Sequence, residues 1–419
     1  MAKFMIQGGA PLSGTIDVAA NKNAVLPMMA ACLLTDDDCY LDNVPRIADV
    51  ITMAAILKEL GAVVEFEADS RLHINCSTVR SFEPAEHLVE RLRASIVLLG
   101  PLLARIGRAN MHHPGGDAIG TRSIGTHIHA LQALGARFDV QDNFYRARAE
   151  RPDGDCAVFL DEASVTATEN AMLLAASQPR TTVISNAASE PHITNLATML
   201  ESMGATIHGT ESNVLRIEGT AGLHGTTARI WPDHIETGTF AALAAACRGT
   251  VTIRNVVAAH LDMVLHILQK MGVNLEVDGE TMVVRPAELM AIPKIQTGVW
   301  PAFPTDLASI FIVLATQADG MTLVHDWMYE ARMFFVDRLA YMGAKIVLAD
   351  PHRAVVSGPT VLRGRELVGP DIRAGIALVM AALIADGESE IEHIELIDRG
   401  YECIDERLRA LGANIVRVS

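Results

Sequence analysis

The sequence predicts an α/β protein made of two domains, each built from three related units. Three observations support this class. The chain has 419 residues, of which 50% are hydrophobic, so it is long enough to form more than one core. One short phrase returns six times along the chain, and a very apolar segment lies between successive copies. The regular return of such phrases is typical of repeat architectures.

Each copy of the phrase consists of an amphipathic helix, then Leu or Met, then Gly, then Ala or Val, then alternating residues. A glycine just past a helix end adopts the left-handed cap conformation at little cost, and the alternation indicates a strand with one buried face. The phrase glycines are separated by 74, 69, 68, 71 and 69 residues, so the repeats have nearly equal lengths. They are Gly61, Gly135, Gly204, Gly272, Gly343 and Gly412.

The apolar segments between the phrases predict a second, buried helix in each repeat. Three repeats make a domain of about 210 residues, which is an ordinary domain size, so we expect the seam near 219–229. Two similar domains that face each other form a cleft, which is a usual place for a ligand. The apolar segments span residues 23–34, 93–104, 169–177, 238–247, 306–316 and 375–385.

The composition excludes several classes of function. A net charge of -16 and an aromatic content of only 5% oppose binding to nucleic acid or to anionic membranes. The N-terminus has no apolar signal segment, and the apolar run 374–385 is too short to span a membrane. The six cysteines are scattered without a CxxC pair, so no metal site or disulfide framework is expected. These features predict a soluble cytoplasmic protein.

Unusual polar residues lie where the buried helices are expected to begin. Asp, Asn and Thr at such positions are ordinary helix caps. Lys and Arg there oppose the helix dipole, and Lys22, Arg93 and Arg373 all have this placement. Each could be a surface charge or an ion-pair partner, but together they predict a site for a phosphate or a carboxylate. The helix starts read Asn21-Lys22-Asn23, Arg91-Leu92-Arg93, Asp233 to Thr237, Pro304-Thr305-Asp306 and Asp371-Ile372-Arg373.

A glycine-containing loop, MHHPGGDAIGTRSIGTH, carries one acid and one arginine. Asp117 follows Gly115 and Gly116, and Arg122 lies five residues further on. A flexible loop of this kind is able to fold over a substrate and exclude water. Closure would raise the pKa of a carboxylic acid by desolvation, which suits it to proton transfer. The alternative is a solvated surface aspartate.

These motifs together resemble the UDP-N-acetylglucosamine 1-carboxyvinyltransferase family of enolpyruvyl transferases, nearly end to end. The sister family that acts on shikimate 3-phosphate shares the fold but not this set of motifs. The shared motifs are KNA at Lys22, RAS at Arg93, PGGxAIGxR from Pro114, PDxIETGT from Pro232, FPTD ending at Asp306, the Glu330–Arg332 segment, DIRAG from Asp371 and DRGYE from Asp398.

The resemblance implies a two-domain fold of inside-out α/β barrels, with three repeats in each domain. It places residues 22–229 in one domain, which carries a mobile loop at 112–123. Residues 230–419 form the other domain, which the segment 1–21 completes. It also implies the reaction: phosphoenolpyruvate gives its enolpyruvyl group to the 3-hydroxyl of UDP-N-acetylglucosamine, and phosphate leaves. This begins peptidoglycan precursor synthesis, and neither a metal nor an organic cofactor is expected.

The resemblance also assigns roles to residues of this chain. Asp306 is the base for the acceptor hydroxyl, and Asp117 is the loop acid. The cations Lys22, Arg122, Arg332, Arg373 and Arg399 are expected around phosphoenolpyruvate, with Arg93 supporting the same network. Asn23 and Glu190 are expected near the reacting groups, Ser164 and Val165 at the uridine, and Asp233 and Asp371 with the other substrate-binding residues.

Several residues depart from the family pattern. Many members have Cys where this chain has Asp117, so the resemblance predicts insensitivity to fosfomycin, an epoxide that alkylates that cysteine. The family has Pro-x-Asp after the loop arginine, whereas this chain has Ser123-Ile124-Gly125, and Thr166 replaces a common glycine. These changes leave two alternatives open: a related transferase that uses a different nucleotide or nucleotide sugar, and a catalytically silent homologue with a binding role.

Overall fold

The protein was described from a computed structural model, which covers residues 2–68, 70–117, 119–150 and 154–418. The chain forms two compact units. The first unit comprises Met1–Ala19, Asp117–Thr121 and Pro232–Ser419, and the second comprises Ala20–Gly116 and Arg122–Trp231.

The second unit is built from three repeats, each with its own sheet in the described part of the chain. Most neighbouring strands are antiparallel, and the pairs β13–β3 and β9–β10 are parallel. The strand orders are β13 (Thr227–Arg229), β3 (Asp38–Asp42), β5 (Leu72–Asn75), β4 (Val63–Phe66); β6 (Arg108–His112), β8 (Phe144–Ala149), β7 (Ala136–Gln141); and β11 (Thr206–His208), β12 (Val214–Glu218), β10 (Thr181–Ser185), β9 (Cys156–Phe159).

The first unit repeats this arrangement with three four-stranded sheets among its described residues. In each of them one edge strand is parallel to its neighbour and the other pairs are antiparallel. The strand orders are β15 (Asn274–Asp278), β16 (Thr281–Arg285), β14 (Thr250–Arg254), β2 (Ser13–Asp17); β17 (Lys294–Gln296), β18 (Gly320–His325), β20 (Arg353–Gly358), β19 (Lys345–Asp350); and β21 (Glu366–Val368), β22 (Glu388–Glu392), β1 (Lys3–Gln7), β23 (Asn414–Val418).

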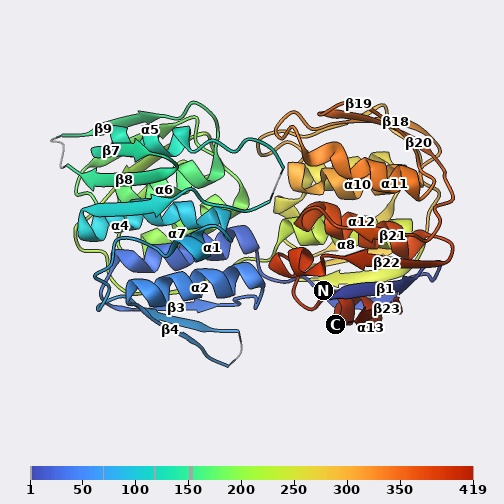
Figure 1. Cartoon of the computed structure of the whole chain (residues 1–419), viewed down its shortest axis with the longest axis horizontal. Helices are drawn as coiled ribbons and strands as arrows, with labels where there is room; N and C mark the ends of the chain where they lie inside the picture. The colour runs from blue at the N-terminus through green and yellow to red at the C-terminus, as the bar shows by residue number, and fades with distance from the viewer. Residues whose placement is uncertain (1, 69, 118, 151–153, 419) are drawn as a thin grey trace. The chain divides into compact units, whose positions relative to one another are not determined.

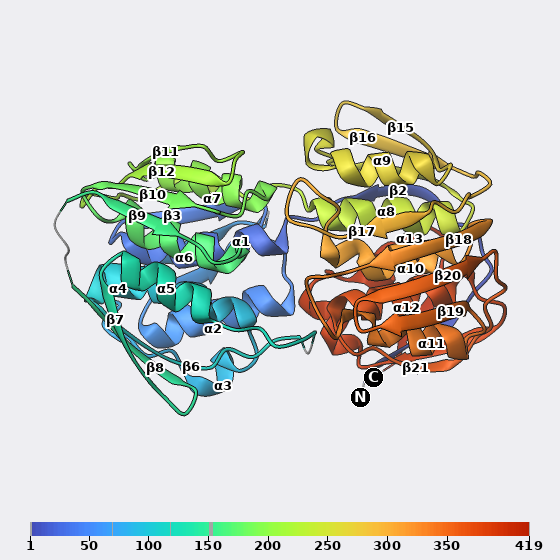
Figure 2. The same cartoon turned by 90° about the horizontal axis from the view of Figure 1, so that it is seen from above.

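The N-terminal segment supplies strands to two sheets of the first unit. Strand β1 lies between β22 and β23, and Phe4 is opposite both Ile391 and Arg417. Figure 1 shows β1, in dark blue, among the red strands of the C-terminal end. Figure 2 shows β2, also in blue, beside the yellow elements that follow residue 250, and β2 pairs with β14. The first unit is therefore discontinuous in sequence.

The six phrase glycines end their helices as the sequence predicts. Each has a positive φ, between 80° and 114°, and each is followed by the expected strand. At Gly61 the backbone N–H bonds back to the carbonyls of Leu57 and Lys58, which closes the helix. The helices that precede these glycines are α2 (Ala48–Leu60), α5 (Gly125–Ala133), α7 (Pro191–Ser202), α9 (Asp262–Lys270), α11 (Val336–Tyr341) and α13 (Ile404–Ala410).

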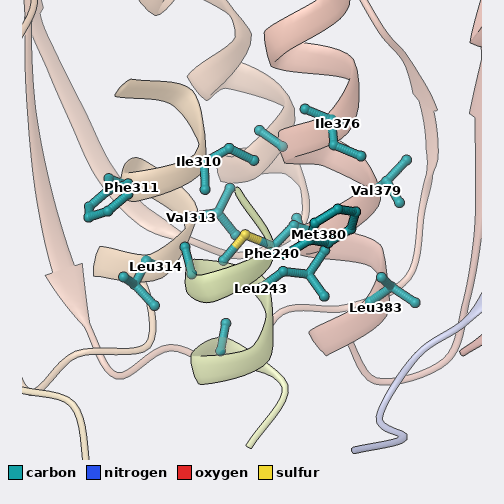
Figure 3. Packing of buried hydrophobic residues seen from close by; sticks show 14 of the residues in the cluster. Phe240, Leu243, Ile310, Phe311, Val313, Leu314, Ile376, Val379, Met380 and Leu383 are labelled. Carbon is teal, nitrogen blue, oxygen red and sulfur yellow. The ribbon is translucent and has the colours of Figure 1, made fainter. Parts of the chain in front are cut away.

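The apolar segments form the central helices of the two units. Every residue of α8 and of α10 is buried, and Figure 3 shows side chains such as Phe240, Ile310 and Met380 packed together between three of these helices. Each such side chain contributes about 1.5–3 kcal/mol when it leaves water. The central helices are α1 (Lys22–Ala31), α4 (Leu99–Ile106) and α6 (Val165–Ala176) in the second unit, and α8 (His234–Ala246), α10 (Ala308–Ala315) and α12 (Ile372–Ile384) in the first.

Candidate active site

Two of the three central helices of the first unit, α8 and α12, begin with aspartates that cap them. The side chain of Asp233 accepts hydrogen bonds from the backbone N–H groups of Ile235 and Glu236, and Asp371 caps α12 in the same way. Burial raises the pKa of both carboxyls, although nearby arginine charges and the cap hydrogen bonds act in the opposite direction. These two residues therefore fix the helix starts from which other polar side chains project.

Asp306 lies between two buried arginines. It belongs to the 3₁₀ turn Thr305–Leu307, just before α10. Arg332 Nη2 is 3.1 Å from Asp306 Oδ1, and Arg373 donates to Oδ2 from Nε at 3.0 Å and from Nη2 at 2.8 Å. The two arginine side chains are 3% and 7% exposed, whereas that of Asp306 is 25% exposed. The most accessible member of this cluster is therefore the carboxylate.

Both arginines are held by further contacts within the first unit. Arg373 Nη1 donates to the hydroxyl of the buried Tyr401 at 3.1 Å, and the Arg332 guanidinium lies over the ring of Tyr329. Burial lowers the pKa of each guanidinium, but the surrounding anionic groups, first of all Asp306, raise it by more. Both side chains consequently remain cationic without access to water.

The loop residue Asp117 forms an ion pair within the first unit. Asp117 Oδ1 is 2.5 Å from Nη1 of Arg399, and the two side chains are 16% and 15% exposed. Arg399 ends the turn Ile394–Arg399. The Asp117 carboxylate also contributes to raising the pKa of Asp371, so this ion pair lies near the start of α12.

The rest of the loop is fastened by Glu330. Its carboxylate accepts a hydrogen bond from the backbone N–H of Thr121 at 2.6 Å, which lowers the pKa of Glu330. Gly120 has a φ of +143°, which favours glycine, and a Cβ there would lie 2.3 Å from Glu330 Oε2, so that the carboxylate would have to shift. Ala118, within the predicted loop, lies outside the described residues.

In the second unit, Lys22 and Asn23 begin α1. Asn21 caps this helix by accepting a hydrogen bond from the backbone N–H of Asn23. The ammonium of Lys22 lies 2.7 Å from Asp49 Oδ2, and the two side chains are 13% and 5% exposed. Lys22 thus has a fixed counter-charge beside it.

Arg93 binds the two ends of the glycine loop. Its guanidinium donates to the carbonyl oxygens of Pro114, Arg122 and Ser123. A Cβ at Gly116 would lie 2.7 Å from Cβ of Arg93. The glycine therefore serves close packing as well as the flexibility that the sequence suggested.

A neutral hydrogen-bond network lies beside Arg122, and sequence reasoning missed it. Asn170 accepts from the Gly100 N–H and donates to the Ile96 carbonyl, which fixes the orientation of its amide. The same amide nitrogen lies 2.9 Å from Nδ1 of His127, and Nε2 of His127 lies 3.0 Å from the Thr166 hydroxyl. Burial, aided by Arg93 and Arg122, lowers the pKa of His127 to about 3, so the ring is neutral.

The neighbouring predicted residues lie at two helix starts. Ser164 caps α6, whose first residue is Val165, through a hydrogen bond from the Ala167 N–H. Glu190 is the residue before α7. Burial, with the charge of Glu190, raises the pKa of Glu169 well above its ordinary range.

The structure therefore brings the predicted residues of the first unit into one region. Asp306, Arg332 and Arg373 touch directly, and the Asp117–Arg399 pair lies near the start of the same helix, α12. The predicted residues of the second unit are Lys22, Asn23, Arg93, Arg122, Ser164, Val165 and Glu190.

The described residues contain neither a cluster typical of metal sites nor a membrane-spanning helix. Among them, no group of three or more His, Cys, Asp or Glu side chains is arranged to hold a metal ion. Within the same part of the chain, no helix has the length and apolarity needed to cross a membrane.

Known proteins resemble this chain over its whole length. Residues 6–408 match the family EPSP synthase (3-phosphoshikimate 1-carboxyvinyltransferase). The chain is 46% identical to the UDP-N-acetylglucosamine 1-carboxyvinyltransferase of Treponema denticola, over 99% of each protein. It is 45% identical to the protein of that name from Bradyrhizobium diazoefficiens, over 99% of this chain and 98% of the relative.

Solved structures agree in fold. The enolpyruvyl transferase NikO from Streptomyces tendae has a TM-score of 0.90 at 22% identity, over 100% of this chain and 99% of the other. EPSP synthase from Acinetobacter baumannii has a TM-score of 0.75 at 17% identity, over the whole of both chains. The α/β enolpyruvyl transferase fold and the family resemblance predicted from the sequence are confirmed. The chain therefore belongs to the EPSP synthase family of carboxyvinyltransferases, and within it to the UDP-N-acetylglucosamine 1-carboxyvinyltransferases.

Proposed function

We propose that this protein transfers the enolpyruvyl group of phosphoenolpyruvate to the 3-hydroxyl of UDP-N-acetylglucosamine and releases phosphate. The observation that carries the proposal is the Asp306 carboxylate held between the guanidinium groups of Arg332 and Arg373. A base beside buried cations suits a reaction between a hydroxyl and an anionic enol ester. The reaction supplies peptidoglycan precursor synthesis, and we propose the cytoplasm as its place because both substrates are metabolites of that compartment.

The addition step requires a base and an acid. Asp306 accepts the proton of the acceptor hydroxyl, and the oxygen of that hydroxyl forms a bond to C2 of phosphoenolpyruvate. Asp117 donates a proton to the C3 methylene, which becomes a methyl group, and a tetrahedral intermediate results. In the second step a methyl proton is removed, the C2=C3 double bond re-forms, and the C2–O bond to phosphate breaks, so that phosphate leaves.

The cations explain how the side chains of Asp306 and Asp117 become available for proton transfer. Asp306 and Asp117 are paired with Arg332, Arg373 and Arg399. Phosphoenolpyruvate carries a phosphate and a carboxylate, and these groups compete for the same guanidinium forks. We infer that substrate binding takes over these arginines. Asp306 is then released as the base, while Asp117, without its counter-charge, takes up a proton from solvent and donates it to C3. Lys22, Asn23, Arg93, Arg122 and Glu190 are proposed to assist at the same substrate.

A second candidate is transfer of enolpyruvate to a different nucleotide or nucleotide sugar. The observation that favours it is the altered group of residues that the family uses at uridine, where Gly125 stands in place of an aspartate and Thr166 in place of a glycine. The Thr166 hydroxyl is bonded to His127. A silent homologue is less well supported, because the chain retains Asp306, Lys22, Arg122 and Arg399 together.

Release of phosphate tests the proposal directly. The protein is mixed with phosphoenolpyruvate and UDP-N-acetylglucosamine, phosphate is measured, and the sugar nucleotide product is weighed. We expect one phosphate per enolpyruvyl product, and no phosphate when the acceptor is omitted. Other nucleotide sugars are tested as acceptors in the same assay. Faster turnover with one of them would favour the second candidate. No turnover with any acceptor would contradict both candidates.

A further inference from the structure

Asp326 is a fully buried carboxylate that neither the motifs nor the proposed mechanism uses. It follows β18, and its side chain is 0% exposed. Oδ1 accepts hydrogen bonds from the Thr297 hydroxyl at 2.9 Å and from the Met328 N–H at 3.0 Å. Oδ2 accepts from the Thr305 hydroxyl at 2.5 Å. A buried charge is costly unless it is paired and hydrogen-bonded, so each of these contacts is significant.

Two of the neighbours of Asp326 are also neighbours of Asp306. Thr305 precedes Asp306 in the same 3₁₀ turn. Nε of Arg332 lies 3.8 Å from Asp326 Oδ2, while Nη2 of the same guanidinium lies 3.1 Å from Asp306 Oδ1. Oδ2 of Asp326 is therefore linked to the proposed base, Asp306, in two ways. One link is the Thr305 hydroxyl, and the other is the guanidinium of Arg332, which lies beside both carboxylates.

The carboxylates of Asp306 and Asp326 differ in how easily they can break their ion pairs with Arg332. Asp326 is closed off from water and held by three donors, whereas a quarter of the Asp306 side chain is exposed. A buried guanidinium still needs a counter-charge when one of its partners leaves. Asp326 is able to supply that charge permanently, while Asp306 exchanges its partner.

We propose that Asp326 is a positioning residue for the transfer reaction. It holds Thr305, and with it the turn that carries Asp306, and it stays beside Arg332 when Asp306 turns to the acceptor hydroxyl. This inference rests on the proposed function of Asp306. It predicts that contacts on the Oδ2 side of Asp326 matter for turnover and that contacts on the Oδ1 side do not.

Two threonines offer a matched pair of variants. Thr305→Val removes the donor to Oδ2, and the nearest remaining cationic group is then Nε of Arg332, which is drawn away from Asp306. Thr297→Val removes a donor to Oδ1, the other oxygen of the same carboxylate. Each variant loses one hydrogen bond to Asp326, so both are expected to lower the melting temperature to a similar extent.

The test compares kcat, the KM for UDP-N-acetylglucosamine and the Kd for phosphoenolpyruvate. We expect Thr305→Val to lower kcat at least tenfold and to weaken phosphoenolpyruvate binding several-fold, with the KM for the acceptor unchanged. Thr297→Val should stay within about twofold of the wild type in all three quantities, as an unreacting contact predicts. Asp326→Asn should lower kcat at least as much as Thr305→Val does.

Equal effects of the two threonine variants on kcat would overturn the proposal, as would normal turnover of Asp326→Asn. If Asp326→Asn does not fold, the threonine pair still decides. A wild type that releases no phosphate with UDP-N-acetylglucosamine would contradict the proposed function instead. The two threonine variants are then compared by calorimetry with phosphoenolpyruvate alone, and identical binding in both would overturn the role of Asp326.

Discussion

Two groups of polar side chains, one in each unit, are held in opposite ways. In the first unit, Asp306 and Asp117 pair with arginines through charges that an anionic ligand can exchange. In the second unit, the starts of α5 and α6 are joined by a neutral network of His127, Asn170 and Thr166, whose amide orientation is fixed by backbone groups. The same repeat architecture thus carries ion pairs that a ligand can exchange in one place, and a neutral hydrogen-bond network in another. We relate the first to proton transfer and the second to recognition.

The largest effect is expected when the exchangeable carboxylate is removed. Asp306→Asn keeps the shape of the side chain but does not accept a proton, so kcat should fall by about 10²–10⁴-fold. Binding of UDP-N-acetylglucosamine, measured by calorimetry, should remain close to that of the wild type. Near-normal turnover of this variant would show that the base lies elsewhere.

Removing a cation should affect one substrate and spare the other. Arg399→Ala deletes a charge-assisted contact worth about 1.5–3 kcal/mol, so the KM for phosphoenolpyruvate should rise roughly 10- to 100-fold. Arg409→Ala is the control, because this arginine is 47% exposed and pairs with Asp405 instead. A change of equal size in both variants would count against an anion site at Arg399.

Exchanging the loop acid for a thiol should preserve activity within about tenfold and create sensitivity to a drug. Asp117→Cys retains a proton donor, and the ordinary pKa of a thiol is about 8.5 against about 3.9 for an aspartic acid. The activity optimum should therefore move to higher pH. A thiolate also attacks epoxides far more readily than a carboxylate does, so fosfomycin should inactivate this variant irreversibly.

Intact-mass measurement decides the assignment of Asp117. The wild type and the cysteine variant are incubated with fosfomycin and the sugar nucleotide, and then weighed. We expect an adduct on the variant alone. An adduct on the wild type, or none on the variant, would refute Asp117 as the loop acid; Asp117→Ala should fold but lose most of its turnover.

The last prediction concerns the neutral network, and its effect appears in stability, not in turnover. Because burial lowers the pKa of His127 to about 3, the unfolded chain binds a proton below pH 6.5 that the folded chain refuses. Stability should fall with decreasing pH between about 6.5 and 3, by roughly 1.4 kcal/mol per pH unit from this residue. His127→Asn should reduce that slope in urea titrations, and an unchanged slope in this variant would contradict the prediction.

The repeat pattern was predictable because it is local. The helix, its glycine cap and the alternating strand all lie within one stretch of sequence, as around Gly61. The very apolar central helices were equally visible, since no polar face interrupts them. The motifs gave Asp306 and Arg373 through the family resemblance, and the structure places their side chains in contact.

The remaining contacts depend on residues far apart in the chain. Nothing in the sequence distinguishes the buried Asp326 from the half-buried Asp350, because both lie at strand ends. Asp326 directly follows β18, and Asp350 is the last residue of β19. The burial of Asp326 is set by Thr297 and Thr305, which belong to a separate loop. The position of Arg93 at a helix start likewise predicts that it binds an anion. Only the folded loop shows that its guanidinium donates to three backbone carbonyls.

The placement of β1 has a consequence for the order in which the protein is made. Lys3 and Glu390 form an ion pair although they are 387 residues apart in sequence, and β1 lies between β22 and β23. The second unit leaves the ribosome as an almost continuous segment and has its strands available early. The first unit has to keep its opening strands unpaired until the last ones emerge. Its last sheet therefore cannot close before β22 and β23 have emerged, and until then the unpaired strands are exposed to aggregation.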